Sequence, residues 1–325
     1  MVSVAMCTYN GAKYLAEQLE SIARQSRQVD ELVVCDDKST DGTVGVLQEF
    51  AAKAPFPVKI HINEANLGST RNFDQCMGLC RGEILILCDQ DDIWAYDRVQ
   101  RQVDYLAAHP EHEAVFSDAY LIDDKGERQN HMLWDNFGFN RERQVKWQSG
   151  KAKDLLFEGY IVTGATMAVR KRALGFLSPF PVHLGPYIHD AWIALVLSLN
   201  DQIGFITDPL LSYRVHASQQ VGFGQKLEPV RLKDRWKRDR DKKISPIRQR
   251  AQLLKALIEA LEKVEGVSPA SLTRLKELQV HFQVRANLPE NRLRRLEPAL
   301  SELVKGRYTF SSEHWWLPFL GDLLE

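Results

Sequence analysis

Three carboxylates stand within four residues, directly after one apolar segment of the chain. Residues 84–88 read Ile-Leu-Ile-Leu-Cys, and Asp89, Gln90, Asp91 and Asp92 follow. Alternate side chains of an extended segment share a face, so Asp89 and Asp91 can reach one divalent cation. Carboxylates and substrate phosphates are ligands that Mg²⁺ and Mn²⁺ prefer. The pattern predicts a metal–phosphate site holding Mg²⁺ or Mn²⁺; the alternative is a solvated acidic turn before a helix.

Asp190 is the best candidate for a catalytic base. It stands at the start of an apolar helical segment that contains Trp192. The N-terminus of a helix favours an ionised carboxylate, and such a carboxylate can take the proton of an attacking alcohol. The alternative is a plain helix cap. His216 could be a third metal ligand or a diphosphate contact, and its alternative is a structural histidine.

Two further polar segments are candidates for binding a nucleotide. Asp36 and Asp37 end a second apolar segment, and a carboxylate there can accept a hydrogen bond from a base N–H while Tyr9 packs beside the base. Arg71 lies one turn into a predicted helix and could reach a phosphate or the base. The alternatives are that residues 36–41 only cap a helix and that Arg71 is a surface arginine.

The elements that position these residues alternate between strand and helix. Apolar segments at 2–6, 31–35, 58–62 and 84–89 predict strands, with amphipathic helices between them. This alternation predicts a parallel sheet with right-handed crossovers, so the polar loops that follow the strands gather along one edge. Further strands are predicted at 114–118, 163–169, 203–206 and 210–215, and the aromatic segment 130–150 is predicted to be an irregular loop that shapes a pocket.

Composition divides the chain near residue 224. The 325 residues are 44% hydrophobic and 26% charged, as in ordinary globular proteins. Residues 226–325 hold 21 Lys and Arg against 14 Asp and Glu, whereas the preceding part holds 21 against 29. Helices are predicted at about 246–264, 269–286 and 289–304. We therefore expect a catalytic domain over 1–224 and a basic α-helical region over 225–325.

The basic region has two interpretations. Residues 231–243 hold eight basic side chains and Trp236, and Trp315 and Trp316 stand near the end of the chain. One interpretation is contact with the anionic surface of the inner membrane; the other is a helical cap or a homodimer interface. Nucleic acid is not expected as a partner because the catalytic half is acidic.

Two features of the sequence predict where in the cell the protein is located. Met1 leads directly into the first predicted strand, which leaves no room for a signal peptide. The longest apolar run, residues 191–199, is too short to cross a bilayer. The expected location is the cytoplasm, with attachment to the inner membrane from that side as the variant.

Seven short motifs, in order and in register over residues 1–220, resemble glycosyltransferase family 2. They are Cys-Thr-Tyr-Asn-Gly at 7–11, Asp-Asp-Lys-Ser-Thr-Asp-Gly-Thr at 36–43, Asn-Leu-Gly at 66–68, Asp-Gln-Asp-Asp-Ile-Trp at 89–94, Thr-Gly-Ala at 163–165, His-Asp-Ala-Trp at 189–192 and Tyr-Arg-Val-His at 213–216. Three positions depart from the family pattern: Cys7 replaces a common Pro, Lys38 a common Gly, and His189 a frequent acidic residue.

The resemblance implies a GT-A-type, Rossmann-like α/β fold for binding a nucleotide sugar, a mostly parallel sheet flanked by helices, a divalent metal and inversion at the anomeric carbon. It implies these site residues: Asp190 as the base; Thr8, Tyr9, Asn10, Asp37, Gly68, Arg71, Asp89 and Gln90 for the nucleotide; Asp89, Asp91 and His216 for the metal; and Trp94, Asp118, Thr163, Gly164, His189 and Trp192 for the donor and acceptor pocket.

The basic helical region and the Asp-Gln-Asp-Asp-Ile-Trp form are similar to bacterial enzymes of O-antigen and core polysaccharide assembly, rhamnosyltransferases among them. The expected reaction moves a sugar from a dTDP- or UDP-sugar to a hydroxyl of a saccharide or lipid-linked saccharide. Two alternatives are a DxD-type phosphohydrolase and a nucleotide-sugar-binding protein without catalysis. A dehydrogenase is disfavoured because no Gly-x-Gly-x-x-Gly follows the first strand.

Overall fold

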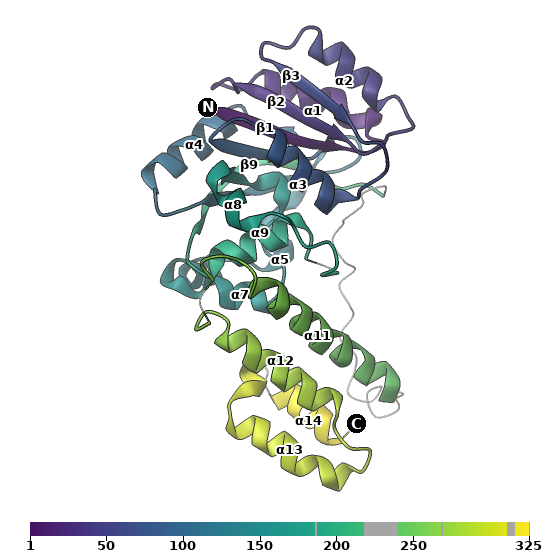
Figure 1. Cartoon of the computed structure of the whole chain (residues 1–325), viewed down its shortest axis with the longest axis vertical. Coiled ribbons are helices and arrows are strands. Elements are labelled where there is room, and N and C mark those ends of the chain that lie inside the picture. The colour runs from purple at the N-terminus through teal and green to yellow at the C-terminus, as the bar shows by residue number, and fades with distance from the viewer. Residues whose placement is uncertain (186, 218–239, 268, 311–315, 325) are drawn as a thin grey trace. The chain divides into compact units, whose positions relative to one another are not determined.

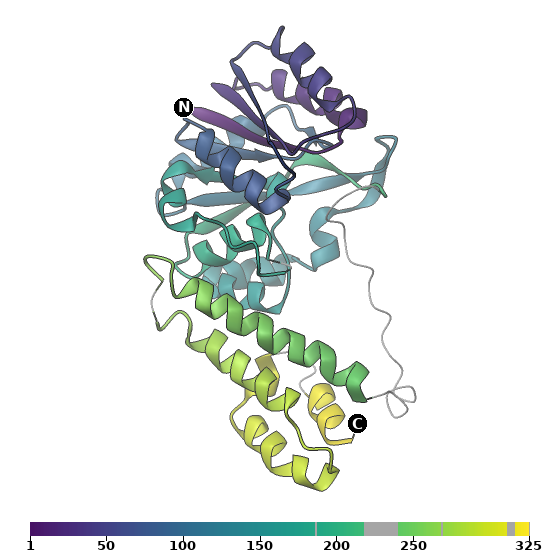
Figure 2. The same ribbon diagram turned by 45° about the vertical axis from the view of Figure 1, so that its right-hand side comes forward.

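Four parallel strands form the first half of the sheet in the computed structural model, which describes residues 1–185, 187–217, 240–267, 269–310 and 316–324. Their order is β3-β2-β1-β4, and every neighbouring pair is parallel. Helices α1 and α2 cover one face and α3 covers the other (Figures 1 and 2). The strands are β1 (Val2–Thr8), β2 (Glu31–Asp36), β3 (Val58–Ile62) and β4 (Ile84–Cys88), and the helices are α1 (Ala12–Ala23), α2 (Thr43–Ala51) and α3 (Ser69–Leu79). The predicted parallel sheet is confirmed.

The second half of the sheet contains one reversal of direction that matters for the site. Strand β8 runs antiparallel to both β4 and β6, and β6 is parallel to β9. The carboxyl ends of β1, β2, β4, β6 and β9 therefore meet the amino end of β8 at one edge. These strands are β5 (Ile93–Trp94), β6 (Ala114–Ile122), β7 (Arg128–Met132), β8 (Ala168–Arg170) and β9 (Ile203–Arg214).

Two strand predictions in this half differ from the structure. Strand β9 is continuous where two short strands were predicted, because the chain passes Pro209 by a shift of register against β6. The predicted strand 163–169 begins only at Ala168, because Gly164–Thr166 form a 3₁₀ turn. That turn places Thr163 and Gly164 at the edge of the sheet where β4 and β6 end.

Three aromatic side chains of the segment 130–150 belong to the core. Trp134, Phe139 and Trp147 are buried, and Phe139 packs edge to face against both tryptophans, with ring centroids 4.8 Å apart for Trp134 and 5.4 Å apart for Trp147. Phe116 and Phe205 of the sheet complete the cluster. The segment folds into β7 and short helices, namely α5 (Leu133–Phe137), α6 (Arg141–Lys146) and α7 (Ala152–Glu158). The prediction of an irregular pocket loop was wrong because a buried aromatic cluster and an aromatic pocket wall have the same composition.

Three further helices belong to residues 1–223. They are α4 (Arg98–Ala108), α8 (Leu174–Leu177) and α9 (His189–Ser198), and α9 packs against α3. Nearly all of α9 is buried, as its apolar sequence predicts. Its first turn lies at the functional edge of the sheet.

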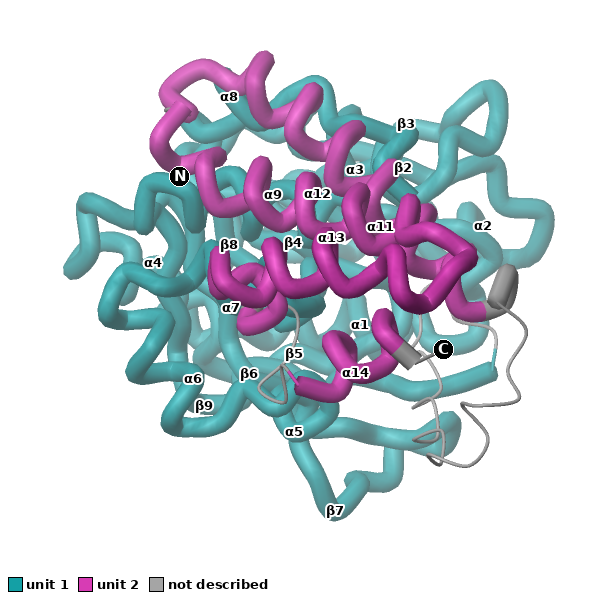
Figure 3. Tube along the Cα trace, turned by 90° about the horizontal axis from the view of Figure 1, so that it is seen from below, with its two compact units in different colours: residues 1–223 teal, residues 224–325 magenta. Residues whose placement is uncertain are grey.

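Residues 224–325 form a second compact unit in the contact pattern of the chain, coloured separately in Figure 3. It consists of α11 (Arg240–Leu261), α12 (Thr273–Ala286), α13 (Arg292–Val304) and α14 (Trp316–Leu324). Buried Asp322 joins these helices by accepting hydrogen bonds from Arg285 Nε at 2.6 Å and Tyr308 Oη at 2.9 Å. The predicted C-terminal helices are present, while Trp236 and Trp315 lie outside the described residues. Among the described helices, none has both the length and the apolar character needed to cross a bilayer.

Candidate active site

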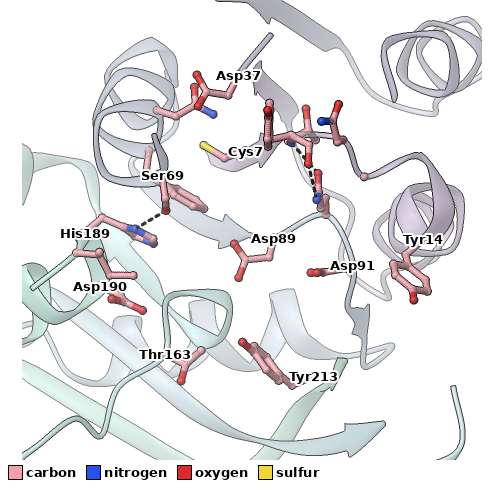
Figure 4. A pocket seen from close by; sticks show the side chains of 18 of the residues that line it. Cys7, Tyr14, Asp37, Ser69, Asp89, Asp91, Thr163, His189, Asp190 and Tyr213 are labelled. Atoms are coloured by element: carbon pink, nitrogen blue, oxygen red, sulfur yellow. Dashed lines mark hydrogen bonds between the residues drawn. The ribbon is translucent and has the colours of Figure 1, made fainter. Parts of the chain in front are cut away.

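A cavity of about 390 Å³ lies at the edge of the sheet where the polar loops gather (Figure 4). Its volume falls within the range of small-molecule sites. The sequence-predicted residues that line it are Thr8, Tyr9, Asn10, Asp37, Asp89, Gln90, Asp91, Thr163, His189, Asp190 and His216. Gly68, Arg71, Trp94, Asp118, Gly164 and Trp192 do not line it.

Gln90 fixes the loop that follows β1. Its Oε1 accepts a hydrogen bond from the Tyr9 backbone N–H at 2.8 Å, and its Nε2 donates to the Tyr9 carbonyl at 3.1 Å. A Cβ at Gly11 would lie 2.1 Å from Gln90 Oε1, so only glycine permits this close approach. The paired hydrogen bonds hold Tyr9 and Asn10 in a fixed position at the cavity wall.

Asp37 orders the loop between β3 and α3. Its carboxylate accepts hydrogen bonds from Leu67 N at 2.7 Å, Gly68 N at 2.9 Å and Asn63 Nδ2 at 2.9 Å. Gly68 has φ of +77°, a backbone conformation that favours glycine. Asp37 therefore lines the cavity and holds Gly68 in place, whereas the Arg71 side chain on α3 is exposed.

Asp89, Asp91 and Asp190 point into a common space together with the Tyr213 hydroxyl (Figure 4). Burial, followed by the charges of Asp91 and Asp190, raises the pKa of Asp89 to about 7. The cavity thus brings carboxylates together where little water can screen them. A cation or a positively charged group would reduce the repulsion between these carboxylates.

Asp92 and Trp94 stand in the segment that follows Asp91. Asp92 is buried and accepts a hydrogen bond from Arg214 N at 3.0 Å. Burial, with the charges of Asp91 and Asp89, raises its pKa well above the usual range. Trp94 is buried against Arg98, whose guanidinium lies 4.1 Å from the ring centroid. Both residues are therefore buried and do not line the cavity.

The donor set of Asp89, Asp91 and His216 fits a divalent cation by its chemistry. His216 Nε2 lies 2.8 Å from Asp91 Oδ2, and the imidazole packs 4.9 Å from the Tyr14 ring. Within the described ranges, the only group of three or more potential ligand atoms within 4.8 Å of one another is His109, Glu111 and His112. The ligand atoms of Asp89, Asp91 and His216 therefore do not all lie within 4.8 Å of one another. Substrate phosphates would have to supply the remaining oxygen ligands.

The carboxylate of Asp190 is buried and held by three hydrogen bonds. It lies in the first turn of α9, is 3% exposed, and accepts hydrogen bonds from Gly164 N at 2.8 Å and Ala191 N at 2.7 Å. The Tyr160 hydroxyl donates a further hydrogen bond to its Oδ2. These three hydrogen bonds fix the orientation of the Asp190 carboxylate at the first turn of α9. Gly164 does not line the cavity but touches the carboxylate that does.

His189 holds the first turn of α9 against α3. Its ring stacks on Phe73 at 4.0 Å, and its Nδ1 lies 3.4 Å from Ser69 Oγ. Burial lowers the pKa of His189, so the ring is neutral at pH 7. Its Nε2 is buried without a hydrogen-bond partner. A neutral ring adds no charge beside Asp190 and leaves one polar atom for a ligand.

Two sequence-predicted pocket residues have structural contacts instead. Asp118 Oδ1 accepts hydrogen bonds from Ala119 N at 2.8 Å and Trp134 N at 3.1 Å, which ties β6 to the start of α5. Trp192 Nε1 donates to the Leu177 carbonyl at 2.9 Å inside the core.

Sequence reasoning also missed several residues that line the cavity. These are Cys7, Gly11, Lys13, Tyr14, Ser69, Asn72, Phe73, Tyr160, Ile188 and Tyr213. Tyr213 stands within the Tyr-Arg-Val-His motif and could have been found there. Tyr160 carries no local signal, because its partner Asp190 is distant in sequence.

This combination of a Rossmann-like sheet, a polar cavity at one edge and paired aspartates after a central strand belongs to the GT-A class of glycosyltransferases. Solved structures support the fold. Staphylococcus aureus TarS 1-349 in complex with UDP-GlcNAc matches with a TM-score of 0.54 at 16% identity, over 99% of this chain and 89% of that one. Mannosyltransferase PcManGT from Pyrobaculum calidifontis, in complex with GDP-Man and Mn²⁺, matches with a TM-score of 0.52 at 19% identity, over 99% and 85%.

The model of Glycosyl transferase family 2 matches residues 3–176, and the chain belongs to that family. The dTDP-rhamnosyl transferase RfbG of Shigella flexneri is 27% identical over 230 residues, which cover 67% of this chain and 73% of RfbG. The chain spans 59% of the length of mycobacterial relatives that it matches at 26% identity. The family match does not favour either alternative, a DxD-type phosphohydrolase or a nucleotide-sugar-binding protein without catalysis.

Proposed function

We propose that the chain moves a sugar from a nucleotide-sugar donor to an acceptor hydroxyl with inversion at the anomeric carbon, and that Asp190 is the base. The observation that carries this proposal is the placement of Asp190. It is a buried carboxylate held by Tyr160, Gly164 N and Ala191 N, in the same cavity as Asp89 and Asp91. A base and a leaving-group site that share one cavity are what a single in-line displacement requires.

In this reaction the acceptor hydroxyl donates its proton to Asp190 while its oxygen attacks the anomeric carbon. The bond between that carbon and the diphosphate oxygen breaks, and the electron pair leaves with the nucleoside diphosphate. The hydrogen bonds to Asp190 fix the carboxylate so that little reorganisation accompanies proton transfer. A divalent cation held by Asp89 and Asp91, with His216 beside them, would neutralise the charge of the departing diphosphate.

We propose a dTDP-sugar, with rhamnose as the sugar, as the donor, and a UDP-sugar as the second candidate. The similarity to RfbG over 230 residues supports the first choice. Asp37, Tyr9 and the ordered loop at Gly68 would form the nucleotide end of the site, because they follow the carboxyl ends of β2, β1 and β3. The acceptor is a saccharide or lipid-linked saccharide of a bacterial surface polysaccharide.

The donor is tested with a panel of dTDP-, UDP- and GDP-sugars, each with Mg²⁺ and with Mn²⁺. Binding is read from thermal shift and isothermal titration, and turnover from the release of nucleoside diphosphate in the presence of oligosaccharide acceptors. A clear preference for dTDP-rhamnose is expected. Binding of GDP-sugars alone would refute the donor proposal and leave the fold and the base untouched.

The base is tested with Asp190→Asn, using Asp118→Asn as a matched variant of another buried aspartate. Asp190→Asn should bind donor normally and lose about 10²–10⁴-fold in kcat, the contribution of a positioned acid or base. Asp118→Asn should retain kcat, since the Asp118 carboxylate accepts hydrogen bonds from the Ala119 and Trp134 backbone and does not line the cavity. Normal turnover by a folded Asp190→Asn protein would exclude Asp190 as the base.

For the C-terminal unit we propose contact with an anionic membrane surface through α13. Four apolar side chains at helical spacing, Leu293, Leu296, Leu300 and Val304, are exposed on one face of this helix. Exposed Arg292 and Arg294 flank that face. An apolar stripe bordered by arginines suits anionic lipid, and such contact would bring the enzyme to lipid-linked acceptors.

Vesicle sedimentation tests this contact. Wild type should sediment with phosphatidylglycerol vesicles and less with phosphatidylcholine vesicles, and Leu293→Ser/Val304→Ser should lose the difference. Val280→Ser, an exposed apolar residue on α12, is the matched control. Equal partitioning of all three proteins would overturn the proposal. A dimer in solution that only the double variant disrupts would also overturn it, and would assign the surface to a second copy.

A further inference from the structure

Two histidines and a glutamate gather in the turn between α4 and β6. One potential ligand atom from each of His109, Glu111 and His112 lies within 4.8 Å of the other two. His109 Nδ1 is 3.0 Å from Glu111 Oε1, and the two imidazole centroids are 5.3 Å apart. Four residues of chain, His-Pro-Glu-His, thus bring three good metal-binding groups together.

The backbone of this turn is held in place independently of any ligand. His112 N donates to the His109 carbonyl at 3.1 Å, and Arg170 Nε donates to the His112 carbonyl at 2.9 Å. His109 N in turn donates to the Tyr105 carbonyl at 3.0 Å, at the end of α4. A prearranged turn lowers the entropy that a ligand must overcome to bind.

Neighbouring groups also fix the His112 ring. The Tyr105 hydroxyl lies 3.1 Å from His112 Nδ1, and the Tyr105 ring stacks on His109 at 4.4 Å. Gly204 of β9 leaves the room for both, since a Cβ there would lie 2.0 Å from the Tyr105 hydroxyl and 2.7 Å from His112 Nδ1. The His112 ring is therefore held in one place beside His109.

From this geometry we infer that His109, Glu111 and His112 bind one divalent transition-metal cation of the Zn²⁺ class. Two imidazoles with one carboxylate, in a three-ligand set that leaves a position for water, favour zinc and its neighbours in the periodic table over Mg²⁺. The His109 and Glu111 side chains are 42% and 59% exposed, so both can move the short distance needed to close around an ion. A bound ion would tie the end of α4 to the start of β6.

This site lies at the opposite edge of the sheet from the catalytic cavity. Strand β8 is antiparallel to both β4 and β6, so β6 (Ala114–Ile122) runs in the same direction as β1, β2 and β4. The turn precedes β6, whereas the cavity is formed by loops that follow the carboxyl ends of β1, β2 and β4. The two sites also differ in ligand chemistry, since the cavity offers Asp89 and Asp91. Occupation of the turn should therefore stabilise the protein without being required for catalysis.

The test uses the full chain, stripped of metal, and titrates it with ZnCl₂ in buffer that contains millimolar Mg²⁺. The Mg²⁺ occupies oxygen-rich sites and competes poorly for imidazole. Wild type should bind one equivalent of Zn²⁺ and show a higher Tm with it. His109→Ala and Glu111→Ala should each bind Zn²⁺ at least about 10-fold more weakly, since even loss of a group that only orients a ligand commonly weakens binding by 10–100-fold.

Two controls make the outcome decisive. His61→Ala removes an exposed histidine elsewhere and should bind Zn²⁺ as wild type does. Circular dichroism without metal should show that His109→Ala and Glu111→Ala remain folded. Wild-type Zn²⁺ affinity in His109→Ala, or equal losses in His61→Ala and His109→Ala, would overturn the proposal.

Discussion

Gly164 lies where the smallest added group would disturb the proposed base. A Cβ at this position would lie 2.7 Å from His189 Nε2 and 3.2 Å from Asp190 Cβ. The His189 ring cannot swing aside, because it is 4% exposed and stacked on Phe73 at 4.0 Å. Gly164→Ala should therefore displace the first turn of α9, which carries Asp190.

These contacts set the size of the expected losses of stability and of kcat in Gly164→Ala. Overpacking of this kind costs about 1–3 kcal/mol of the free energy of unfolding. A displacement of about 1 Å at a catalytic group can lower the rate about 10²-fold. The hydrogen bonds that hold the nucleotide end of the cavity, between Gln90 and Tyr9 and between Asp37 and Gly68, are untouched. We therefore expect Gly164→Ala to lower kcat about 10²-fold while the Kd for donor changes little.

Steady-state kinetics with saturating donor, together with calorimetric donor binding, separates these quantities. Gly175→Ala is the matched control, because a Cβ there meets nothing within 4 Å. The double variant Gly164→Ala/His189→Ala removes the overlap with the ring and should recover part of the lost stability. The reasoning fails if Gly164→Ala retains wild-type kcat and Tm, or if the double variant is as destabilised as the sum of the two single variants.

Three further predictions concern the same site. Tyr160→Phe removes a donor to Asp190 and should lower kcat about 10-fold without changing donor Kd, as a charge-assisted hydrogen bond contributes about 1.5–3 kcal/mol; an unchanged kcat would show that the hydroxyl is dispensable. Gln90→Ala frees the Tyr9 peptide and should weaken calorimetric donor binding about 10-fold, with kcat at saturation preserved; unaltered Kd would contradict a role for this clamp. Burial raises the pKa of Asp118 to about 6 from 3.8, so its ionised form disfavours folding, and stability present at pH 4 is lost as pH rises through 6. Denaturant unfolding should show Asp118→Asn gaining about 1–2 kcal/mol over wild type at pH 7.5 and nothing at pH 4, after allowance for partial screening by solvent; an equal effect at both pH values would argue against this ionisation.

The parallel half of the sheet could be predicted because its signals are local. Each of the first four strands is an apolar segment next to an amphipathic helix, and parallel strands present their following loops at one edge. That rule alone places Tyr9, Asp37 and Asp89 near one another, as the cavity shows. Tyr160 and Phe73 could not be found in this way, because they reach the site through contacts of α9 that depend on the packing of distant segments.

Asp118 and Trp94 illustrate the converse difficulty. Asp118 ends one predicted strand, and Trp94 follows the carboxylates at the end of another. The sequence does not indicate whether either side chain points into the cavity or into the core. The structure shows Asp118 held by the Ala119 and Trp134 amides and Trp94 under Arg98. A buried carboxylate with backbone donors and a catalytic carboxylate have the same sequence appearance, and only the contacts separate them.

The reversed strand β8 explains how residues 89 and 190 share a cavity. Because β8 (Ala168–Arg170) runs antiparallel between β4 and β6, the residues that precede it emerge at the edge where Asp89 follows β4. Gly164 of that segment donates to Asp190 at 2.8 Å, and α9 packs against α3 through His189 and Phe73. Had β8 been parallel, the 3₁₀ turn at Gly164 would lie at the opposite edge, and the first turn of α9 would lose its anchor there. The direction of one three-residue strand therefore brings the proposed base to the proposed leaving-group site. This is why a single methyl group should affect catalysis directly at Gly164, although Gly164 does not line the cavity.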